Sequence, residues 1–272
     1  MNIKELTPRL ASNGVSFYEF DIFKNQPVNA LFTTRNGGVS TGCYSSLNFG
    51  FSSGDDVNLV MRNYELLAEC LSCTTGDLIT AAQTHTNNIK IVTRKDAGMG
   101  VTRPRDFQDI DGLVTNVTGI GLVTAHADCT PVQFFDPVKK VVAVAHSGWS
   151  GTLKNISGRM IQTMVKTYDC NPQDILAAIG PALCQDCFEV DEDVAQKFLA
   201  ANSSYETFMY RKGMKSYFDL RKIIELQLLD EGVVSSHIEC NPICTKCHEE
   251  LFYSHRRMGV NRGVMASAIL LK

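Results

Sequence analysis

Short apolar segments separated by polar or glycine-containing stretches dominate the middle of this chain. The segments at 121–125, 132–135, 141–145 and 176–179 are four or five residues long and contain no charged side chain. Runs of this length and composition are typical of β-strands buried in a core. The same reasoning predicts further strands at 31–34, 89–93 and 112–115.

Longer segments with helical spacing lie between these strands. Apolar residues recur on one helical face within 55–71, 152–168, 191–200 and 219–231. The polar run 94–109 contains two glycines and a proline and is predicted to be a loop. No repeat or linker divides the chain. We therefore predict an α/β fold in which residues 1–272 form a single domain.

Charge and hydropathy exclude several classes of protein. A formal net charge of −3 argues against an electrostatic nucleic-acid binder, whose domains are typically basic. No apolar segment approaches the roughly 18 to 20 residues that cross a bilayer. The start Met1-Asn2-Ile3-Lys4-Glu5 lacks the apolar region of a signal peptide. We therefore expect a cytoplasmic protein that binds neither nucleic acid nor membranes.

Three short segments each place a metal-ligand side chain among small residues. They are Gln83-Thr84-His85, Ala127-Asp128-Cys129 and His146-Ser147-Gly148-Trp149. Two imidazoles and one thiolate form a donor set suited to zinc or copper. Three protein ligands leave one position open for water or substrate, which is typical of a catalytic metal site.

Each of these residues also has a purely structural explanation. Cysteine is among the most buried residue types, and a histidine near an apolar run is usually packed and hydrogen-bonded. Cys129 and His146 are distinguished because they closely follow the predicted buried strands 121–125 and 141–145. α/β proteins tend to place their chemistry at such strand ends, which favours a functional role.

A series of motifs runs in order from about residue 30 to the C-terminus. They resemble the successive signatures of the laccase-domain (YfiH-like) family, whose fold implies a single α/β domain with mixed β-sheets sandwiched by helices. In that family the equivalents of His85, Cys129 and His146 bind zinc or copper. The motifs are Thr33-Thr34-Arg35-Asn36-Gly37-Gly38, Ser46-Leu47-Asn48-Phe49-Gly50, Gln83-Thr84-His85, Asp111-Gly112-Leu113-Val114, Ala127-Asp128-Cys129, His146-Ser147-Gly148-Trp149, Ile179-Gly180-Pro181, Phe188-Glu189-Val190-Asp191 and Phe252-Tyr253-Ser254-His255-Arg256-Arg257.

The resemblance implies a purine nucleoside enzyme. Family members were first called polyphenol oxidases, and others have been linked to peptidoglycan editing, but purine nucleoside chemistry is the better supported activity. It comprises phosphorolysis of adenosine, inosine, guanosine and methylthioadenosine to the base and (methylthio)ribose 1-phosphate, with deamination of adenosine. The expected partners are therefore a small-molecule nucleoside and phosphate, for a monomer or a homodimer.

The predicted catalytic residues are His85, Cys129, His146 and Asp128, with zinc, or alternatively copper, as the cofactor. A divalent ion held by one thiolate and two neutral imidazoles can lower the pKa of bound water from about 16 towards about 7. Deamination by such a centre also needs a proton shuttle. Asp128 is the candidate because it is adjacent to Cys129.

Phosphorolysis requires an anion site and stabilisation of a positively charged sugar. Arg35, Asn48, Arg256 and Arg257 are the predicted substrate contacts, and Arg262 is a further candidate. Ordinary surface charge or a structural ion pair explains each arginine equally well.

Two positions depart from the family pattern. Ser150 stands where members commonly carry Arg or Lys, so a cation that could hold phosphate is missing there. Met258 replaces an acidic residue often found after the Ser-His-Arg-Arg segment. Neither change affects a predicted metal ligand.

Two further residues near the predicted ligands have open roles. Trp149 either forms a stacking wall for a purine or is a buried residue that fixes the turn after His146. His126 lies three residues before Cys129, and positions three apart on a strand face opposite sides. We therefore expect His126 to lie outside the metal ligands.

Three Cys-x-x-Cys pairs raise a second metal hypothesis. They are Cys70/Cys73, Cys184/Cys187 and Cys244/Cys247. A zinc ribbon typically separates two pairs by about 15 to 20 residues, whereas 56 residues lie between Cys187 and Cys244. Ten cysteines without a secretory signal indicate reduced thiols. The spacing therefore disfavours a structural four-cysteine zinc site.

Two other classes of enzyme fit the same residues. Cys129 could be a nucleophile activated by His146 or His85, as in an amidase or another Cys-dependent hydrolase. A copper-dependent phenol oxidase is the other alternative. True multicopper oxidases use more histidines than the six in this chain, which disfavours that machinery.

Overall fold

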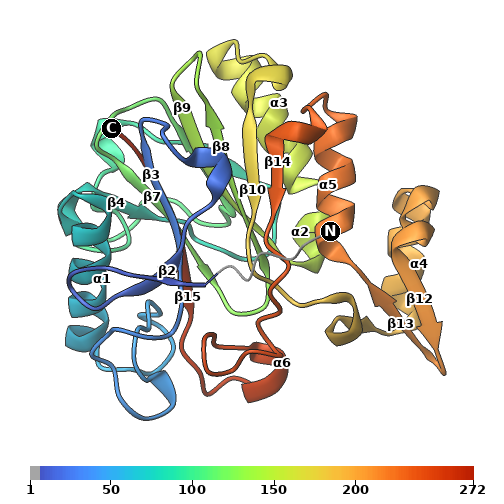
Figure 1. Cartoon of the computed structure of the whole chain (residues 1–272), viewed down its shortest axis with the longest axis horizontal. Helices are drawn as coiled ribbons and strands as arrows, with labels where there is room; N and C mark the ends of the chain where they lie inside the picture. The colour runs from blue at the N-terminus through green and yellow to red at the C-terminus, as the bar shows by residue number, and fades with distance from the viewer. Residues whose placement is uncertain (1–6) are drawn as a thin grey trace.

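The structure is a computed structural model that describes residues 7–272. Two six-stranded sheets form its centre (Figure 1). The segment Met1-Asn2-Ile3-Lys4-Glu5, on which the signal-peptide argument rests, lies outside the described residues. In spatial order the first sheet contains β1 (Arg9–Leu10), β2 (Ser16–Tyr18), β3 (Val28–Thr33), β15 (Met265–Leu271), β7 (Gly121–His126) and β4 (Leu78–Thr80).

The second sheet mixes parallel and antiparallel pairs. Its outer pairs β14–β10 and β6–β5 are parallel, and its inner pairs are antiparallel. In spatial order it contains β14 (Ile238–Cys240), β10 (Leu176–Ile179), β8 (Thr130–Asp136), β9 (Val141–Ser147), β6 (Gly112–Thr115) and β5 (Ile89–Ile91).

Helices cover the outer faces of both sheets. α1 (Val57–Leu71) packs on the first sheet, while α3 (Ile156–Tyr168) and α5 (Leu220–Asp230) pack on the second, on opposite sides of the molecule (Figure 1). The result is a helix–sheet–sheet–helix sandwich. The predicted fold class, α/β with mixed sheets sandwiched by helices, is confirmed.

The central strands contain mostly apolar residues because both of their faces are buried. Successive side chains of a strand point to opposite faces. On β7, Leu122 packs between the two sheets while Val123 packs under α1. On β9, Val142 faces the layer between the sheets and Ala143 the helices. Two-sided burial explains the short uncharged runs in the sequence.

A smaller lobe extends from the second sheet, at the right of Figure 1. It has its own apolar cluster, which includes Phe188, Phe198 and Phe218. Its elements are the sheet β11 (Glu189–Val190), β13 (Lys215–Phe218) and β12 (Met209–Lys212), together with α4 (Glu192–Ala201).

The predicted helix 152–168 is wrong in one respect, because two helices occupy this region. α2 (Trp149–Leu153) ends before Asn155, which has a φ of +56°. Asparagine tolerates this left-handed conformation, and its side-chain oxygen accepts a hydrogen bond from the Gly158 N–H at 3.0 Å. Asn155 therefore starts α3 in a new direction.

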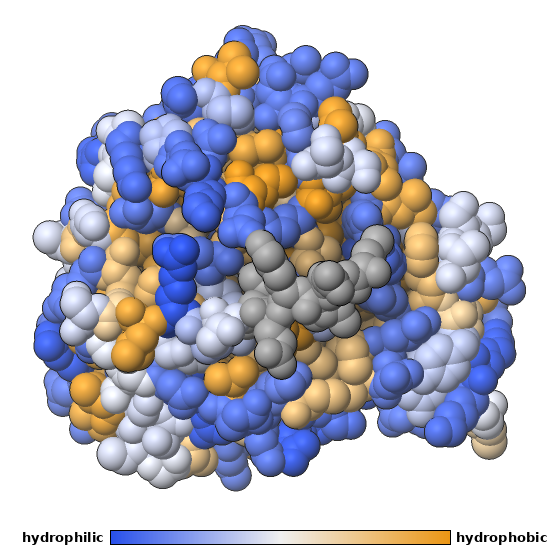
Figure 2. All heavy atoms as spheres, viewed as in Figure 1, coloured by the Kyte–Doolittle hydropathy of each residue, from blue (hydrophilic) through white to orange (hydrophobic). Residues whose placement is uncertain are grey.

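The surface of the face drawn in Figure 2 is mostly hydrophilic, with hydrophobic residues in separate groups. Strongly exposed apolar side chains such as Leu10, Met214 and Val260 lie far apart in the sequence. Within residues 7–272, no helix is both long enough and apolar enough to cross a membrane.

Candidate metal centre and cavity

The three predicted ligands lie where the chain passes between the two sheets. His85 is in the connection from β4 of the first sheet to β5 of the second. Cys129 is in the connection from β7 to β8, which makes the same crossing, and His146 is near the end of β9. Three segments that are far apart in the sequence therefore meet at one end of the sandwich.

The donor atoms of these residues form a compact group. One donor atom from each of His85, Cys129 and His146 lies within 4.8 Å of the others. His85 Nε2 is 3.8 Å from Cys129 Sγ. A Cβ at Gly148 would lie 2.9 Å from this sulfur and 2.8 Å from His85 Cδ2. Glycine at this position therefore leaves the space between the ligands open.

Asp111 organises the group. Its carboxylate accepts a hydrogen bond from His146 Nδ1 at 2.8 Å, which directs the Nε2 of that ring towards Cys129. The same carboxylate accepts the main-chain N–H groups of Thr84, His85 and Thr86 at 3.2, 3.1 and 2.8 Å. One buried carboxylate thus orients His146 and holds the loop that carries His85, as outer carboxylates do around metal-bound histidines.

Asp128 positions Cys129 from the other side. It has a φ of +84°, which is uncommon for a residue other than glycine. One of its carboxylate oxygens accepts the Thr245 hydroxyl at 2.7 Å, and the other accepts the Arg256 main-chain N–H at 2.6 Å. Both oxygens have a donor, so Asp128 fixes the turn next to Cys129. Its predicted role as a proton shuttle stays a prediction.

Opposite charges stabilise each other inside the group. Burial alone would raise the pKa of the Cys129 thiol, but the field of His146 and hydrogen bonds from His146 and His85 outweigh it and lower this pKa to about 6. Burial alone would lower the pKa of His146, but the Cys129 thiolate and Asp111 raise it to about 9. The Asp111 pKa is lowered in spite of burial, chiefly by the bond from His146. A thiolate is therefore ready at neutral pH.

His126 lies behind the ligands and is not one of them. Its Nδ1 is 3.0 Å from the Cys129 carbonyl oxygen and its Nε2 is 2.8 Å from the Thr124 hydroxyl. Burial, helped by the charge of His146, lowers its pKa well below the usual value. This neutral, fully hydrogen-bonded ring supports the turn at Cys129.

The ligand group opens into a cavity of about 1160 Å³. The loop predicted at 94–109 contributes to its wall, and Trp149, which is 37% exposed, lines it at the start of α2. Trp149 is therefore a wall residue and not a buried one. The aromatic and arginine side chains along the wall include Phe107, Trp149, Phe188, Arg105, Arg256 and Arg262.

Arg262 differs from the other two arginines of the cavity. Its Nε is buried and has no hydrogen-bond partner, while its two terminal nitrogens contact the Gly263 carbonyl oxygen at 3.2 Å and the His255 ring at 3.4 Å. Arg256 donates to the carbonyl oxygen of Glu189 at 3.1 Å. Burial lowers the Arg262 pKa, and guanidinium remains charged at any ordinary pH. Arg262 thus places a guanidinium charge, with one buried and unpaired nitrogen, beside Cys129.

Of the four predicted substrate contacts, Arg256 lines the cavity. Arg35, Asn48 and Arg257 lie outside its wall as the described residues define it. Arg35 donates to a main-chain carbonyl oxygen at 2.8 Å, and the Asn48 amide donates to Asp55 at 2.9 Å. Arg257 pairs with Glu249. These bonds brace loops, and contact of these three residues with substrate stays a prediction.

Two of the three Cys-x-x-Cys pairs form a second group, which corrects the expectation drawn from their spacing. Cys184, Cys187, Cys244 and Cys247 bring their sulfurs within 4.8 Å of one another. The 56 intervening residues form the small lobe, α5 and β14. Because β14 is the neighbour of β10, the second cysteine pair lies beside the first. The number of residues between the two cysteine pairs therefore does not indicate how far apart they lie in the fold. The pair Cys70/Cys73 lies apart, at the end of α1.

No role was predicted for Asp111, and a signal for it existed. It belongs to the motif Asp111-Gly112-Leu113-Val114 and directly precedes a predicted strand, whereas Cys129 and His146 follow predicted strands. Its contact with His146, 35 residues away in sequence, depends on the pairing of β6 with β9.

Together the fold and the site define an α/β protein in which three residues that could hold a metal ion lie at the wall of a large cavity. Residues 29–272 match the family described as multi-copper polyphenol oxidoreductase laccase. The chain belongs to this family, and the predicted membership of the laccase-domain (YfiH-like) family is confirmed.

Relatives and solved structures support the same assignment over almost the whole chain. The purine nucleoside phosphorylase YlmD of Bacillus subtilis is 37% identical over 91% of this chain and 90% of its own. The adenosine deaminase RL5 of an unknown prokaryotic organism is 31% identical over 90% and 94%. The crystal structure of the hypothetical protein YfiH of Bacillus licheniformis superposes with a TM-score of 0.90 at 34% identity, covering 97% and 99%.

Proposed function

We propose that this protein is a zinc-dependent purine nucleoside phosphorylase that also deaminates adenosine. The observation that carries the proposal is one cavity lined both by the His85, Cys129 and His146 group and by the arginines Arg256 and Arg262. A metal centre and an anion-binding donor on one wall are what phosphorolysis needs. The similarity to a protein named purine nucleoside phosphorylase supports this choice.

The donor set fits zinc. His85, Cys129 and His146 would hold the ion, because the thiolate forms readily and Asp111 keeps His146 Nε2 available. When bound, zinc supplies Lewis acidity and a lowered pKa for water or substrate groups. Copper suits the same donors, so metal analysis must decide between the two ions.

In phosphorolysis a phosphate oxygen forms a bond to the ribose C1′ while the C1′–N bond to the base breaks. The bonding electrons leave with the base, which takes up a proton, and the ribose carries positive charge during the exchange. Arg262 supplies a guanidinium charge on the cavity wall for phosphate, and Arg256 adds a second cation on the same wall. Lys154, whose Nζ donates to the His85 carbonyl oxygen at 2.9 Å, adds positive charge near Ser150, whose hydroxyl donates to the same oxygen at 3.0 Å.

Aromatic rings of the cavity are suited to a purine. Trp149 exposes a large ring beside His146, and Phe107 lies in the loop that forms part of the wall. Offset stacking on such rings holds a flat base without specifying its exocyclic groups. This arrangement accords with an enzyme that accepts several purine nucleosides.

The test is a chromatographic assay of purified protein with adenosine, with and without phosphate, beside metal analysis. We expect adenine and ribose 1-phosphate to form only when phosphate is present, and to disappear when the metal is removed. Protein that carries stoichiometric metal and consumes no nucleoside would overturn the proposal.

Deamination of adenosine is a second reaction of the same site, favoured by the similarity to the adenosine deaminase RL5. It replaces the C6 amino group by oxygen from water and releases ammonia. Inosine formed without phosphate in the same assay is the expected signature. Without any inosine, the deaminase part of the proposal fails and phosphorolysis stands alone.

A Cys-dependent hydrolase is the competing function, and one contact favours it. His146 links Cys129 to Asp111 through Nδ1 at 2.8 Å, an arrangement like that of a Cys–His–Asp triad. Chelation separates the two functions. A hydrolase would keep its activity without metal and lose it on alkylation of Cys129, whereas the proposed phosphorylase loses activity on either treatment.

A further inference from the structure

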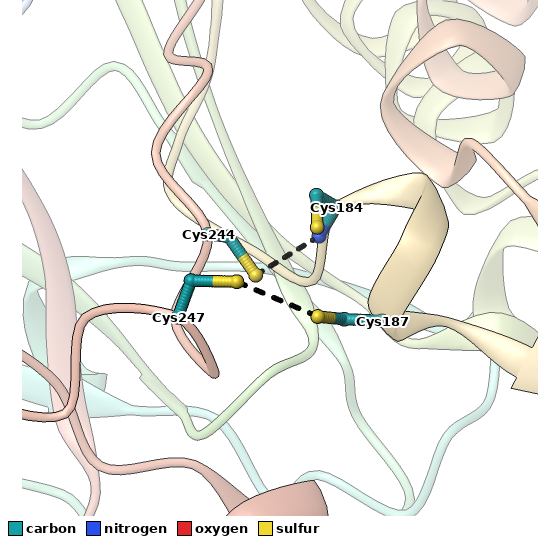
Figure 3. A group of neighbouring side chains, drawn as sticks. All are labelled: Cys184, Cys187, Cys244 and Cys247. Carbon is teal, nitrogen blue, oxygen red and sulfur yellow. Dashed lines mark hydrogen bonds between the residues drawn. The ribbon is translucent and has the colours of Figure 1, made fainter.

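The two Cys-x-x-Cys loops emerge side by side from neighbouring parallel strands. β10 and β14 pair in parallel, with Ile179 opposite Cys240. A further bridge beyond the strands pairs Ala182 with Cys244. The carboxyl ends of parallel strands lie at the same edge of a sheet, so the loops after β10 and β14 face each other. Figure 3 shows the two cysteine pairs approaching from these two segments.

The four sulfurs have the spacing of a tetrahedral metal site. All lie within 4.8 Å of one another, and Cys187 Sγ is 3.6 Å from Cys247 Sγ. Zinc–sulfur bonds of about 2.3 Å place the sulfurs of a tetrahedron about 3.8 Å apart. A disulfide would need about 2.05 Å, and all four thiols are free. The Cys184 main-chain N–H donates to Cys244 Sγ at 3.3 Å, which favours a thiolate there.

We infer that Cys184, Cys187, Cys244 and Cys247 bind one zinc ion as a structural site. Four protein ligands complete the tetrahedron and leave no position for substrate, which distinguishes a structural zinc site from a catalytic one. Binding converts four thiols and Zn²⁺ into a tetrathiolate complex of charge −2 and releases four protons. The inference depends on the cysteine geometry alone and is independent of the proposed function.

Basic residues lie around the loops, and one of them, Arg257, also pairs with Glu249. Lys246 lies within the second Cys-x-x-Cys pair. Arg257 Nη1 donates to the Lys246 carbonyl oxygen at 3.3 Å, and Arg256 Nη1 is 3.5 Å from the Cys187 carbonyl oxygen. Backbone N–H groups and nearby cations are the usual partners of a buried thiolate complex.

The zinc site would fix one wall of the cavity. Leu183 and Phe188, which flank the first cysteine pair, line the cavity. From the second pair, Thr245 donates to Asp128, the residue before Cys129, at 2.7 Å. Arg256 lies over the Phe188 ring at 5.9 Å. Crosslinking the two loops would therefore hold both the aromatic wall and the support of the Cys129 turn in place.

Metal analysis of full-length protein purified under reducing conditions tests the inference. We expect C184S/C247S to carry one zinc fewer per chain than the wild type. C70S/C73S is the matched control, because it removes a Cys-x-x-Cys pair that lies apart, and it should keep the wild-type zinc content. Unchanged zinc in C184S/C247S would overturn the inference.

X-ray absorption provides a second test that does not require the serine variant to fold. In H85A/C129S protein the remaining zinc should have four sulfur neighbours at about 2.3 Å and no nitrogen neighbours. A mixed nitrogen and sulfur environment, no bound metal, iron in place of zinc, or a Cys187–Cys247 disulfide would each overturn the assignment of a zinc tetrathiolate.

Discussion

The two candidate metal-binding groups of this protein both contain cysteine, but they differ in the number of possible ligands and in their access to the cavity. The group of His85, Cys129 and His146 has three ligands and opens into the cavity. The group of four cysteines has its sulfurs within 4.8 Å of one another where two loops meet. The first is braced by the carboxylate of Asp111, and the second by main-chain N–H groups and nearby arginines.

This difference shows how the surroundings, and not the cysteine itself, set the chemistry of a thiolate. A neighbouring His146 that is itself charged by Asp111 keeps Cys129 ionised beside an open position. In the other group, a second cysteine pair offers only further sulfur donors, so a metal bound by all four would have no open coordination position. The variants below act on one group at a time.

The largest effect is expected from C129S. It removes the only thiolate of the open group, so turnover of nucleosides should fall to background and one metal ion per chain should be lost. The Cys70→Ser variant, at a half-buried cysteine of α1 far from both groups, should keep full turnover. Steady-state kinetics with metal analysis provides the measurement. Full turnover in C129S would remove the functional contrast between the two groups.

A smaller effect is expected from D111N. The amide loses the charge that holds His146 and also loses acceptor capacity for the loop N–H groups of His85 and Thr86. Changes of this kind typically cost about 10- to 100-fold in metal affinity or activity. A competition titration with a zinc chelator should find weaker zinc only at the open group. Equal weakening at both groups would mean that Asp111 acts through the whole fold.

R262A should change the KM for phosphate and leave the KM for the nucleoside unchanged. Loss of one charged hydrogen bond, about 1.5 to 3 kcal/mol, corresponds to a KM for phosphate raised about tenfold or more. Arg62→Ala is the matched control because Arg62 pairs with Glu65 on α1, away from the cavity wall. Phosphate-dependence curves for both variants give the comparison. If the two variants behave alike, the Arg262 guanidinium is not the anion contact.

The subtlest expected difference concerns thiol reactivity in protein stripped of metal. The Cys129 pKa is lowered to about 6, so its alkylation should slow as pH falls through about 6 and be near its maximum at pH 7. Burial raises the pKa of Cys187, so this thiol should stay protonated and slow over the same range. Mass spectrometry of alkylated peptides measures both. His146→Asn removes the cation and should move the Cys129 midpoint upward; an unchanged midpoint would contradict the paired charges.

The strand and ligand segments could be predicted from sequence because their signals are local. Uncharged runs marked β7, β8 and β9, and the residues that follow them marked the candidate ligands. The C-terminal strand β15 was missed although it lies in the middle of the first sheet, between β3 and β7. Nothing local distinguishes Met265–Leu271 from a terminal apolar segment, since its place depends on partners more than 130 residues away.

The four-cysteine group could not be predicted because its geometry depends on topology. The parallel pairing of β10 with β14, and not the spacing of the pairs, brings Cys184 and Cys244 together. Asp111 is similar, since its contact with His146 requires the pairing of β6 with β9. That residues 1–272 form one domain, and that the protein is a monomer or a homodimer, stay predictions.

Because the chain crosses between the sheets at His85 and Cys129, the geometry of this group depends on the alignment of the two layers. Warming or mild denaturant that lets the layers slip would separate the donor atoms while every helix and strand persists. Loss of activity is then an early sign of loosening, ahead of any change in circular dichroism. The proposed activity would therefore be lost before the protein unfolds.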